Sequence, residues 1–195
     1  NFENDKGFRD RTSLDMTATS LKEHQYNLIE ENSDKILKIA AIYGANASGK
    51  STVIEAFYFM TTFVENSFKY SSSNKKIPLK RFAFDKKSKE SPSEFEVFIK
   101  YNGNEYQYGF RLDDKKVIEE WLYRRDFRSK NKPKYKPLFE REGQIIECDS
   151  KIENAKNLAN IIEENTLFLS ICGNAKIPYV KDVVQWFKNT RILNM

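Results

Sequence analysis

Hydrophobic and polar residues alternate through the middle of the chain with the period of two that is typical of β-strands. The alternation runs through residues 95–101 and resumes through 106–112, and the Asn-Gly pair at 102–103 between them favours a tight hairpin turn. Further strands are predicted from 117 to 127 and on both sides of residues 141–143. The pattern therefore predicts an antiparallel meander over residues 94–148.

Helical periodicity appears on both sides of this meander. Residues 53–64 and 152–187 place apolar residues three or four positions apart, so each predicted helix has an apolar stripe. The positions are Val53, Phe57, Met60 and Val64, then Ala155, Leu158 and Ile162, and finally Val180, Val183, Val184 and Phe187. Residues 12–18 alternate as in a strand, and the polar run 71–76 predicts a loop.

Residues 36–43 form a short and almost wholly apolar run, as expected of a strand buried on both faces of a sheet. The next eight residues, 44–51, read Gly-Ala-Asn-Ala-Ser-Gly-Lys-Ser, a complete G-x-x-x-x-G-K-[ST] motif, and the first helical stripe follows them. Strand, loop and helix thus occur in the order of a phosphate-binding loop. The predicted nucleotide-binding residues are Gly44, Ala45, Asn46, Ala47, Ser48, Gly49, Lys50, Ser51 and Thr52.

Each residue that the motif specifies has a physical role. Gly44 and Gly49 permit backbone conformations that turn successive N–H groups toward phosphate oxygens at the start of a helix. Lys50 is the predicted catalytic residue, because its ammonium group reaches the β- and γ-phosphates, and the Ser51 hydroxyl is the predicted Mg²⁺ ligand. The predicted cofactors are therefore ATP and Mg²⁺.

Residues 43–57 resemble the phosphate-binding loop of ABC-type ATPases related to the SMC chromosome proteins. The resemblance is greatest to bacterial AAA-family defence ATPases, the RloA, abortive-infection and OLD-nuclease relatives. It implies an α/β P-loop NTPase fold with an antiparallel β-subdomain inserted after the first helix, and an Asn46 that contacts the γ-phosphate or a partner subunit. Other similar segments are residues 2–10, 13–20, 81–85, 92–97, 106–110, 120–123, 138–141 and 165–170.

The resemblance divides the chain into three parts. Residues 1–93 are expected to hold the N-terminal strands and the P-loop core, 94–148 the β-subdomain, and 149–195 a helical segment leading to a missing C-terminal half. ATPases of this type also need an apolar strand that ends in Asp-Glu, to organise Mg²⁺ and the attacking water. We find no such strand, and the first residue is Asn1 rather than Met. We therefore expect half of an ATPase head, which binds nucleotide but hydrolyses it poorly without the water-activating carboxylate.

Three segments come nearest to the missing motifs. Residues 117–120 and 161–164 each place two acids after only two aliphatic residues, and we interpret both as ordinary strand or helix surface. Residues 169–173 resemble the Leu-Ser-Gly-Gly signature of the family but lack its paired glycines.

Three further polar residues have two interpretations each. In the related heads a basic residue near the first strand lies beside the nucleotide, so Arg9 and Arg11 are candidates for that role, or for surface ion pairs. Gln107 is a candidate for the glutamine that links Mg²⁺ to the two lobes, or is an exposed strand residue.

Composition indicates an ordered domain with a basic surface. The 195 residues include 33 Lys and Arg against 28 Asp and Glu, and 39% of the residues are hydrophobic, which suffices for a core. No membrane-spanning or secretory segment is visible, so we expect a cytoplasmic protein. The two cysteines and one histidine have no zinc-site spacing.

The positive charge is concentrated in two stretches, residues 69–89 and 124–141. They are either a contact surface for a DNA backbone or an ordinary lysine-rich surface.

The resemblance implies an ATP-dependent homodimer whose output is antiviral defence, acting on DNA or on a nuclease or toxin partner. The alternative function is a nucleic-acid-binding module in which the nucleotide site is structural or regulatory.

Overall fold

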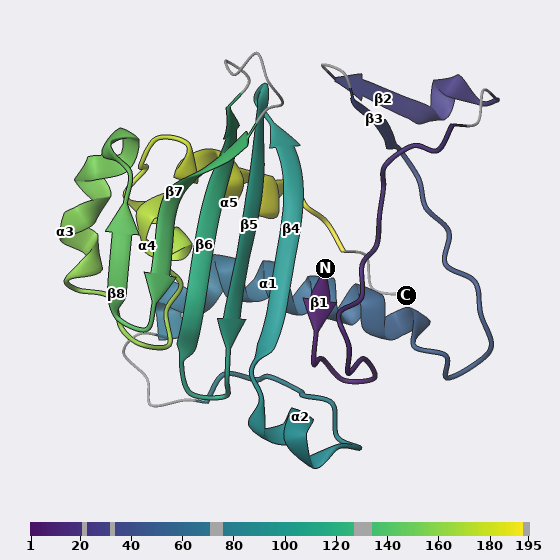
Figure 1. Cartoon of the computed structure of the whole chain (residues 1–195), viewed down its shortest axis with the longest axis horizontal. Helices are drawn as coiled ribbons and strands as arrows, with labels where there is room; N and C mark the ends of the chain where they lie inside the picture. Colours follow the sequence, from purple (N-terminus) through teal and green to yellow (C-terminus); the bar gives the residue numbers. More distant parts are fainter. Residues whose placement is uncertain (21–22, 32–33, 71–75, 127–133, 193–195) are drawn as a thin grey trace.

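The chain builds a six-stranded antiparallel sheet with helices on one face (Figure 1). The computed structural model describes residues 1–20, 23–31, 34–70, 76–126 and 134–192. The strands are ordered β1-β4-β5-β6-β7-β8, where β1 is Phe2–Glu3, β4 Ser93–Tyr101, β5 Asn104–Leu112, β6 Val117–Asp126, β7 Lys134–Glu142 and β8 Ile145–Cys148. The strands predicted for residues 94–148 are therefore present, and β1 extends their sheet at one edge.

Turn chemistry fixes the register of the central hairpin. Asn102 and Gly103 both have left-handed φ values, 52° and 69°, and Tyr101 pairs directly with Asn104. Two successive left-handed residues form the hairpin turn that the Asn-Gly pair predicts. As a result Phe95 lies opposite Phe110, and both rings face the same side of the sheet.

Three helices cover that side. The longest, α1 (Lys50–Tyr70), crosses behind the strands, with α4 (Phe168–Asn174) and α5 (Val180–Asn189) beside it (Figure 1). Phe63 of α1 packs on Phe110, and Phe187 of α5 packs on Tyr108. Side chains of β5 on this face are fully buried, namely Tyr106, Tyr108, Phe110 and Leu112. The core therefore lies between the sheet and this helical layer.

The predicted helix stripes are confirmed for α1 and α5, but Ala155, Leu158 and Ile162 do not share one helix; they fall in a 3-10 turn, a four-residue helix and a loop. Met60 and Val64 of α1 are buried, Val53 and Phe57 are half-buried, and α5 buries all four of its predicted residues. The described residues also form shorter helices, namely α2 (Lys86–Glu90), α3 (Lys156–Ala159) and the 3-10 turns η1 (Gln25–Asn27) and η2 (Ser150–Ala155). The polar run 71–76 lies almost entirely outside the described residues.

The strand predicted for residues 36–43 is wrong for most of its length. Only residues 36 and 37 belong to a strand, β3 (Asp34–Leu37), which pairs with β2 (Leu28–Glu31) in a separate hairpin. Ile39 and Tyr43 are 75% and 90% exposed. A buried parallel strand needs neighbours on both edges, and no described strand lies alongside residues 38–43. The apolar run is therefore extended chain without a sheet.

Residues 12–18 form isolated bridges rather than the predicted strand. Thr12 pairs with Phe2 and Thr17 with Ile36, while Leu14 between them is 49% exposed. This segment connects the main sheet to the β2–β3 hairpin, which is a separate two-stranded sheet (Figure 1) joined to β4 and β6 by ion pairs of Asp34 with Lys100 and Arg125.

Candidate nucleotide-binding site

The predicted phosphate-binding loop lies directly before α1 and is open to solvent. Residues 44–48 are exposed, and α1 begins at Lys50, so the loop meets the N-terminal end of a 21-residue helix. That end carries a partial positive charge from the aligned peptide dipoles and from unbonded N–H groups. The sequence motif and the helix terminus therefore coincide as predicted.

The two glycines of the motif differ in how strongly their surroundings require glycine. Gly49 has φ +91°, and a Cβ there would lie 3.1 Å from the Phe8 ring. A Cβ on Gly44 would lie 2.7 Å from the Ser48 Oγ. Glycine is therefore required by backbone conformation at Gly49, whereas at Gly44 rotation of the Ser48 hydroxyl would relieve the contact.

Three successive backbone amides are available at this point. Within the described residues, the N–H groups of Gly49, Lys50 and Ser51 donate no hydrogen bond, whereas those of Thr52 and Val53 bond to the Gly49 carbonyl at 3.0 and 3.4 Å. Consecutive unbonded amides at a helix N-terminus are the donors that bind phosphate oxygens. The donor set fits an anion.

The Lys50 side chain folds back over the loop. Its Nζ donates to the carbonyl oxygens of Gly44 and Ala45 at 2.8 and 2.6 Å. The ammonium group is thus held above the same loop whose amides are unbonded. Ser51 is exposed, so its hydroxyl is accessible for a hard cation, which prefers oxygen ligands. These residues fit a nucleotide phosphate with Mg²⁺.

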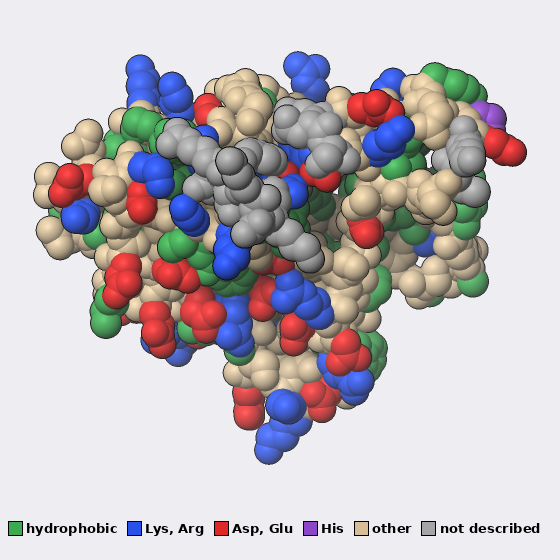
Figure 2. All heavy atoms as spheres, turned by 45° about the horizontal axis from the view of Figure 1, so that its top comes forward, with side chains coloured by type: hydrophobic (Ala, Val, Ile, Leu, Met, Phe, Trp, Pro, Cys, Tyr) green, Lys and Arg blue, Asp and Glu red, His purple; other side chains and the backbone are tan. Residues whose placement is uncertain are grey.

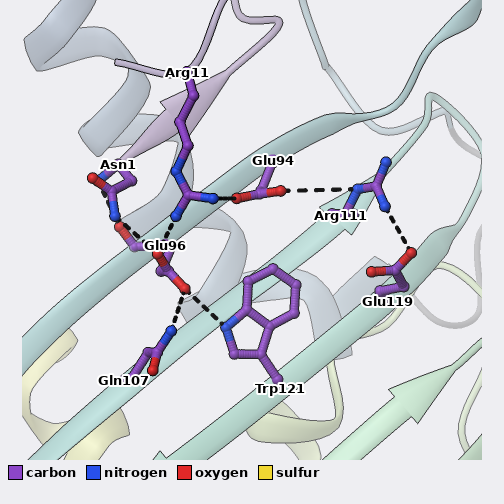
Figure 3. Close-up of polar contacts among 8 residues, drawn as sticks. All are labelled: Asn1, Arg11, Glu94, Glu96, Gln107, Arg111, Glu119 and Trp121. Carbon is purple, nitrogen blue, oxygen red and sulfur yellow. Dashed lines mark hydrogen bonds and ion pairs between the residues drawn. The ribbon is translucent and has the colours of Figure 1, made fainter. Parts of the chain in front are cut away.

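Arg11 and Gln107 do not lie at the loop; they meet on the open face of the sheet around Glu96 (Figure 3). Glu96 accepts hydrogen bonds from Arg11 at 2.5 Å, from Gln107 at 2.7 Å and from Trp121 at 3.1 Å. The Asn1 side chain adds a bond of 2.8 Å, and Arg11 also pairs with Glu94. Arg9 pairs with its neighbour Asp10 at the surface. The ion-pair interpretation is therefore confirmed for Arg9 and Arg11, and Gln107 is a strand residue as predicted but is half-buried rather than exposed.

The interpretation of residues 117–120 as surface is wrong for Glu120. Its side chain is fully buried and accepts hydrogen bonds from the amides of Phe168 and Leu169, at 2.6 and 2.9 Å, and from the Tyr108 hydroxyl at 3.1 Å. Glu120 thus holds the start of α4 against the sheet. The sequence contained a signal for this burial. Residues two apart on a strand share a face, and Glu120 is two residues before the inward-facing Leu122.

Residues 161–164 and 169–173 form no catalytic motif in the described structure. Glu163 and Glu164 are exposed and lie in a loop, and residues 169–173 belong to the buried helix α4.

The two cysteines are free, Cys172 in the core and Cys148 half-buried, and no His, Cys, Asp or Glu cluster suited to a metal occurs among the described residues.

The basic stretches are neutralised only in part where they are described. Arg125 pairs with Glu105 at 2.6 Å, Lys76 and Arg81 both pair with Asp114, and Arg141 is buried beside Glu120. In Figure 2 basic and acidic side chains are intermixed over the visible face. Lys75, Arg128, Lys130 and Lys132 of these stretches lie outside the described residues. Arg141 is therefore removed from the predicted DNA-contacting set.

A groove of about 980 Å³ opens beside α1 but is separate from the loop. It is lined by residues 13–19, by β4 and by apolar side chains of α1 such as Val53, Ile54 and Phe57, and no residue of 44–51 lines it. The groove is thus a second feature of the α1 surface, distinct from the nucleotide site.

Comparison with known proteins is consistent with a nucleotide-binding loop at residues 44–51. Residues 39–189 match the family model described as "AAA domain, putative AbiEii toxin, Type IV TA system". No curated protein and no solved structure matches the chain significantly. The described residues contain no helix with the length and apolar character needed to span a bilayer. The matched region covers most of the chain and includes both the phosphate-binding loop and the sheet, so the chain belongs to this family of AAA domains.

Proposed function

We propose that this chain binds ATP and Mg²⁺ through residues 44–52 and forms part of an ABC/SMC-type ATPase head. The observation that carries the proposal is the set of unbonded amides at Gly49, Lys50 and Ser51, held at the start of α1 with the Lys50 ammonium above them. Family membership indicates a nucleotide-binding domain of the ATPase type.

Phosphate binding changes the partners of Lys50. In the structure its Nζ donates to two carbonyl oxygens of the loop. A β- or γ-phosphate oxygen carries more negative charge than a peptide carbonyl, so it competes successfully for the ammonium group. The loop amides then bind the same phosphates, and Ser51 supplies an oxygen ligand to Mg²⁺.

Uncovered apolar surface supports the half-head part of the proposal. Ile54 and Tyr58 on α1 are 41% and 54% exposed, and they lie on the same helix as the groove-lining Phe57. Ile39, Ile42 and Tyr43 before the loop are exposed as well. Exposed apolar side chains that gather in a patch usually mark an interaction site. We propose that further strands of the complete head cover these side chains and carry the water-activating carboxylate.

ATP-dependent homodimerisation is the next step of the proposal. A partner subunit that caps the phosphates bound at Lys50 and Asn46 would make assembly depend on ATP, and hydrolysis would release it. The family description names a toxin of a type IV toxin–antitoxin system. In keeping with it, we propose a bacterial defence role that acts on DNA or on a nuclease or toxin partner.

The test compares Lys50→Ala with Lys69→Ala, the same change at the other end of the same helix. ATP affinity is measured by calorimetric titration with Mg²⁺, and assembly by sedimentation with and without ATP. We expect Lys50→Ala to weaken ATP binding at least tenfold, about 1.4 kcal/mol, and Lys69→Ala to leave it unchanged. Equal ATP affinity in both variants would refute the proposed site.

The nucleic-acid-binding alternative is judged on the same variants. The lysines of α2, Lys86, Lys87 and Lys89, are exposed and could contact a phosphate backbone together. If DNA binding is the main function, a duplex binds with steep salt dependence, and neither ATP nor Lys50→Ala changes its affinity.

A further inference from the structure

The first residues of the chain form a tight turn against the start of α1. Residues 5–8 close on themselves through two backbone hydrogen bonds, from Asp5 N to Phe8 O at 3.0 Å and from Phe8 N to Asp5 O at 2.8 Å. The turn is tied to the main body by the Lys6 N–H, which donates to the Lys80 carbonyl at 2.7 Å, and by an edge-to-face contact between Phe8 and Phe2. Its position is therefore fixed from both sides.

Three consecutive residues of this turn meet the loop and its helix. Lys6 forms an ion pair with Glu55 on the second turn of α1. Gly7 lies next to Thr52, where a Cβ would be 3.8 Å from the Oγ1. Phe8 places its ring over Gly49, so closely that a Cβ there would be 3.1 and 3.4 Å from two ring carbons.

We propose that Phe8 is a positioning residue for the phosphate-binding loop, which holds Gly49 in its left-handed conformation. This inference rests on the proposed nucleotide site. A glycine adopts positive and negative φ about equally well, so Gly49 alone does not fix the direction of the amides around it. The Phe8 ring occupies the space beside the Cα and limits that freedom, so the amides of residues 49–51 are arranged before phosphate arrives. Such preorganisation raises affinity by lowering the ordering cost of binding.

Hydrogen exchange of the amides that bond to the Gly49 carbonyl tests this role directly. This carbonyl accepts the first two hydrogen bonds of α1, from the amides of Thr52 and Val53. If Gly49 changes conformation freely, these two amides lose protection from hydrogen exchange, whereas the strands behind them keep theirs.

The experiment replaces Phe8 by Ala and by Leu, with Phe84→Ala as the matched control, because Phe84 is 90% exposed. ATP affinity is measured by titration with Mg²⁺, and amide exchange by NMR at Thr52, Val53 and the β5 strand. We expect Phe8→Ala to weaken ATP binding about tenfold and to speed exchange at Thr52 and Val53 only. Phe8→Leu, which keeps apolar bulk over Gly49, should recover part of both effects, and the control should show neither.

Two outcomes would overturn the inference: ATP affinity within twofold of wild type in Phe8→Ala, or unchanged exchange at Thr52 and Val53. If β5 amides also exchange faster in Phe8→Ala, Phe8→Leu decides: a smaller loss of ATP affinity with faster exchange at Thr52 and Val53 but not in β5 supports the inference, and values equal to those of Phe84→Ala overturn it. Failure of the wild-type chain to bind ATP would refute the proposed function, and the exchange measurement would still decide whether Phe8 positions Gly49.

Discussion

Replacing Glu120 by Ala should be among the most destabilising single changes in this chain. The Glu120 carboxylate and the Arg141 guanidinium are 3.6 Å apart, and both side chains are 0% exposed. Glu120 also accepts the two amides that begin α4. Arg141 has its own backbone acceptors, the carbonyls of Thr166 at 2.5 Å and Gly143 at 2.7 Å. Truncation of Glu120 therefore leaves a buried cation without its counter-charge and two buried amides without an acceptor.

The magnitude follows from these losses. Removal of one partner of a buried ion pair costs about 3–5 kcal/mol, and each unsatisfied buried amide adds about 1–3 kcal/mol unless water reaches it. We expect the free energy of unfolding to fall by at least about 4 kcal/mol, a large part of the 5–15 kcal/mol typical of a domain. Glu120→Gln keeps an acceptor oxygen for the amides and should cost less.

The neighbouring residue provides the control. Glu119 lies on the same strand but on the open face, with its side chain 38% exposed and paired with Arg111 at 2.8 Å. Glu119→Ala should cost less than about 1 kcal/mol, because exposed ion pairs contribute little. Urea unfolding followed by circular dichroism measures both variants. A loss in Glu120→Ala within 1 kcal/mol of that in Glu119→Ala would refute the reasoning.

Two further predictions concern stability. Burial raises the pKa of Asp5 from 3.8 to about 6, so its ionised form is less favourable in the folded chain and the free energy of unfolding should fall as pH rises between these values. Asp5→Asn should abolish that fall and stabilise the chain above pH 6 by at most about 3 kcal/mol; a pH series of urea titrations checks this, and an unchanged pH profile would contradict it. A Cβ on Gly109 would lie 2.4 Å from Trp121 and 2.9 Å from the Phe95 carbonyl, so Gly109→Ala should destabilise by about 1–3 kcal/mol in the same assay. No measurable loss would mean that the indole moves aside freely.

The antiparallel sheet was predictable because local signals agree there. A period of two assigned the inward face of β5, and an Asn-Gly turn set its pairing with β4. In α5 the period of 3.6 likewise identified Val183 and Phe187 as core residues. Each of these elements is specified by residues that lie near one another in the sequence.

The buried strand predicted before the phosphate-binding loop was wrong because strand formation there depends on residues far away in the sequence. An apolar run such as residues 38–43 becomes a strand only when other strands pair with it, and its own sequence does not contain them. The buried Glu120 and the contact between Phe8 and Gly49 depend on segments 48 and 41 residues apart. The motif identified the residues of the loop, but its support by the N-terminal turn is a tertiary feature.

The two ends of α1 differ in their contacts. We therefore expect substitutions at one end to change the free energy of unfolding and substitutions at the other to change ATP affinity. Near the C-terminal end, Phe63, Val64 and Ser67 are buried under the sheet and α4, and the Ser67 hydroxyl accepts the amide of Leu167. The first turn, by contrast, is exposed or half-buried and is contacted by the turn of residues 5–8. Changes in the C-terminal half should therefore lower the free energy of unfolding and leave ATP affinity intact once the chain is folded. Changes at the first turn or at Phe8 should act mainly on affinity, because the loop adds few buried contacts to the fold but supplies the donors for phosphate.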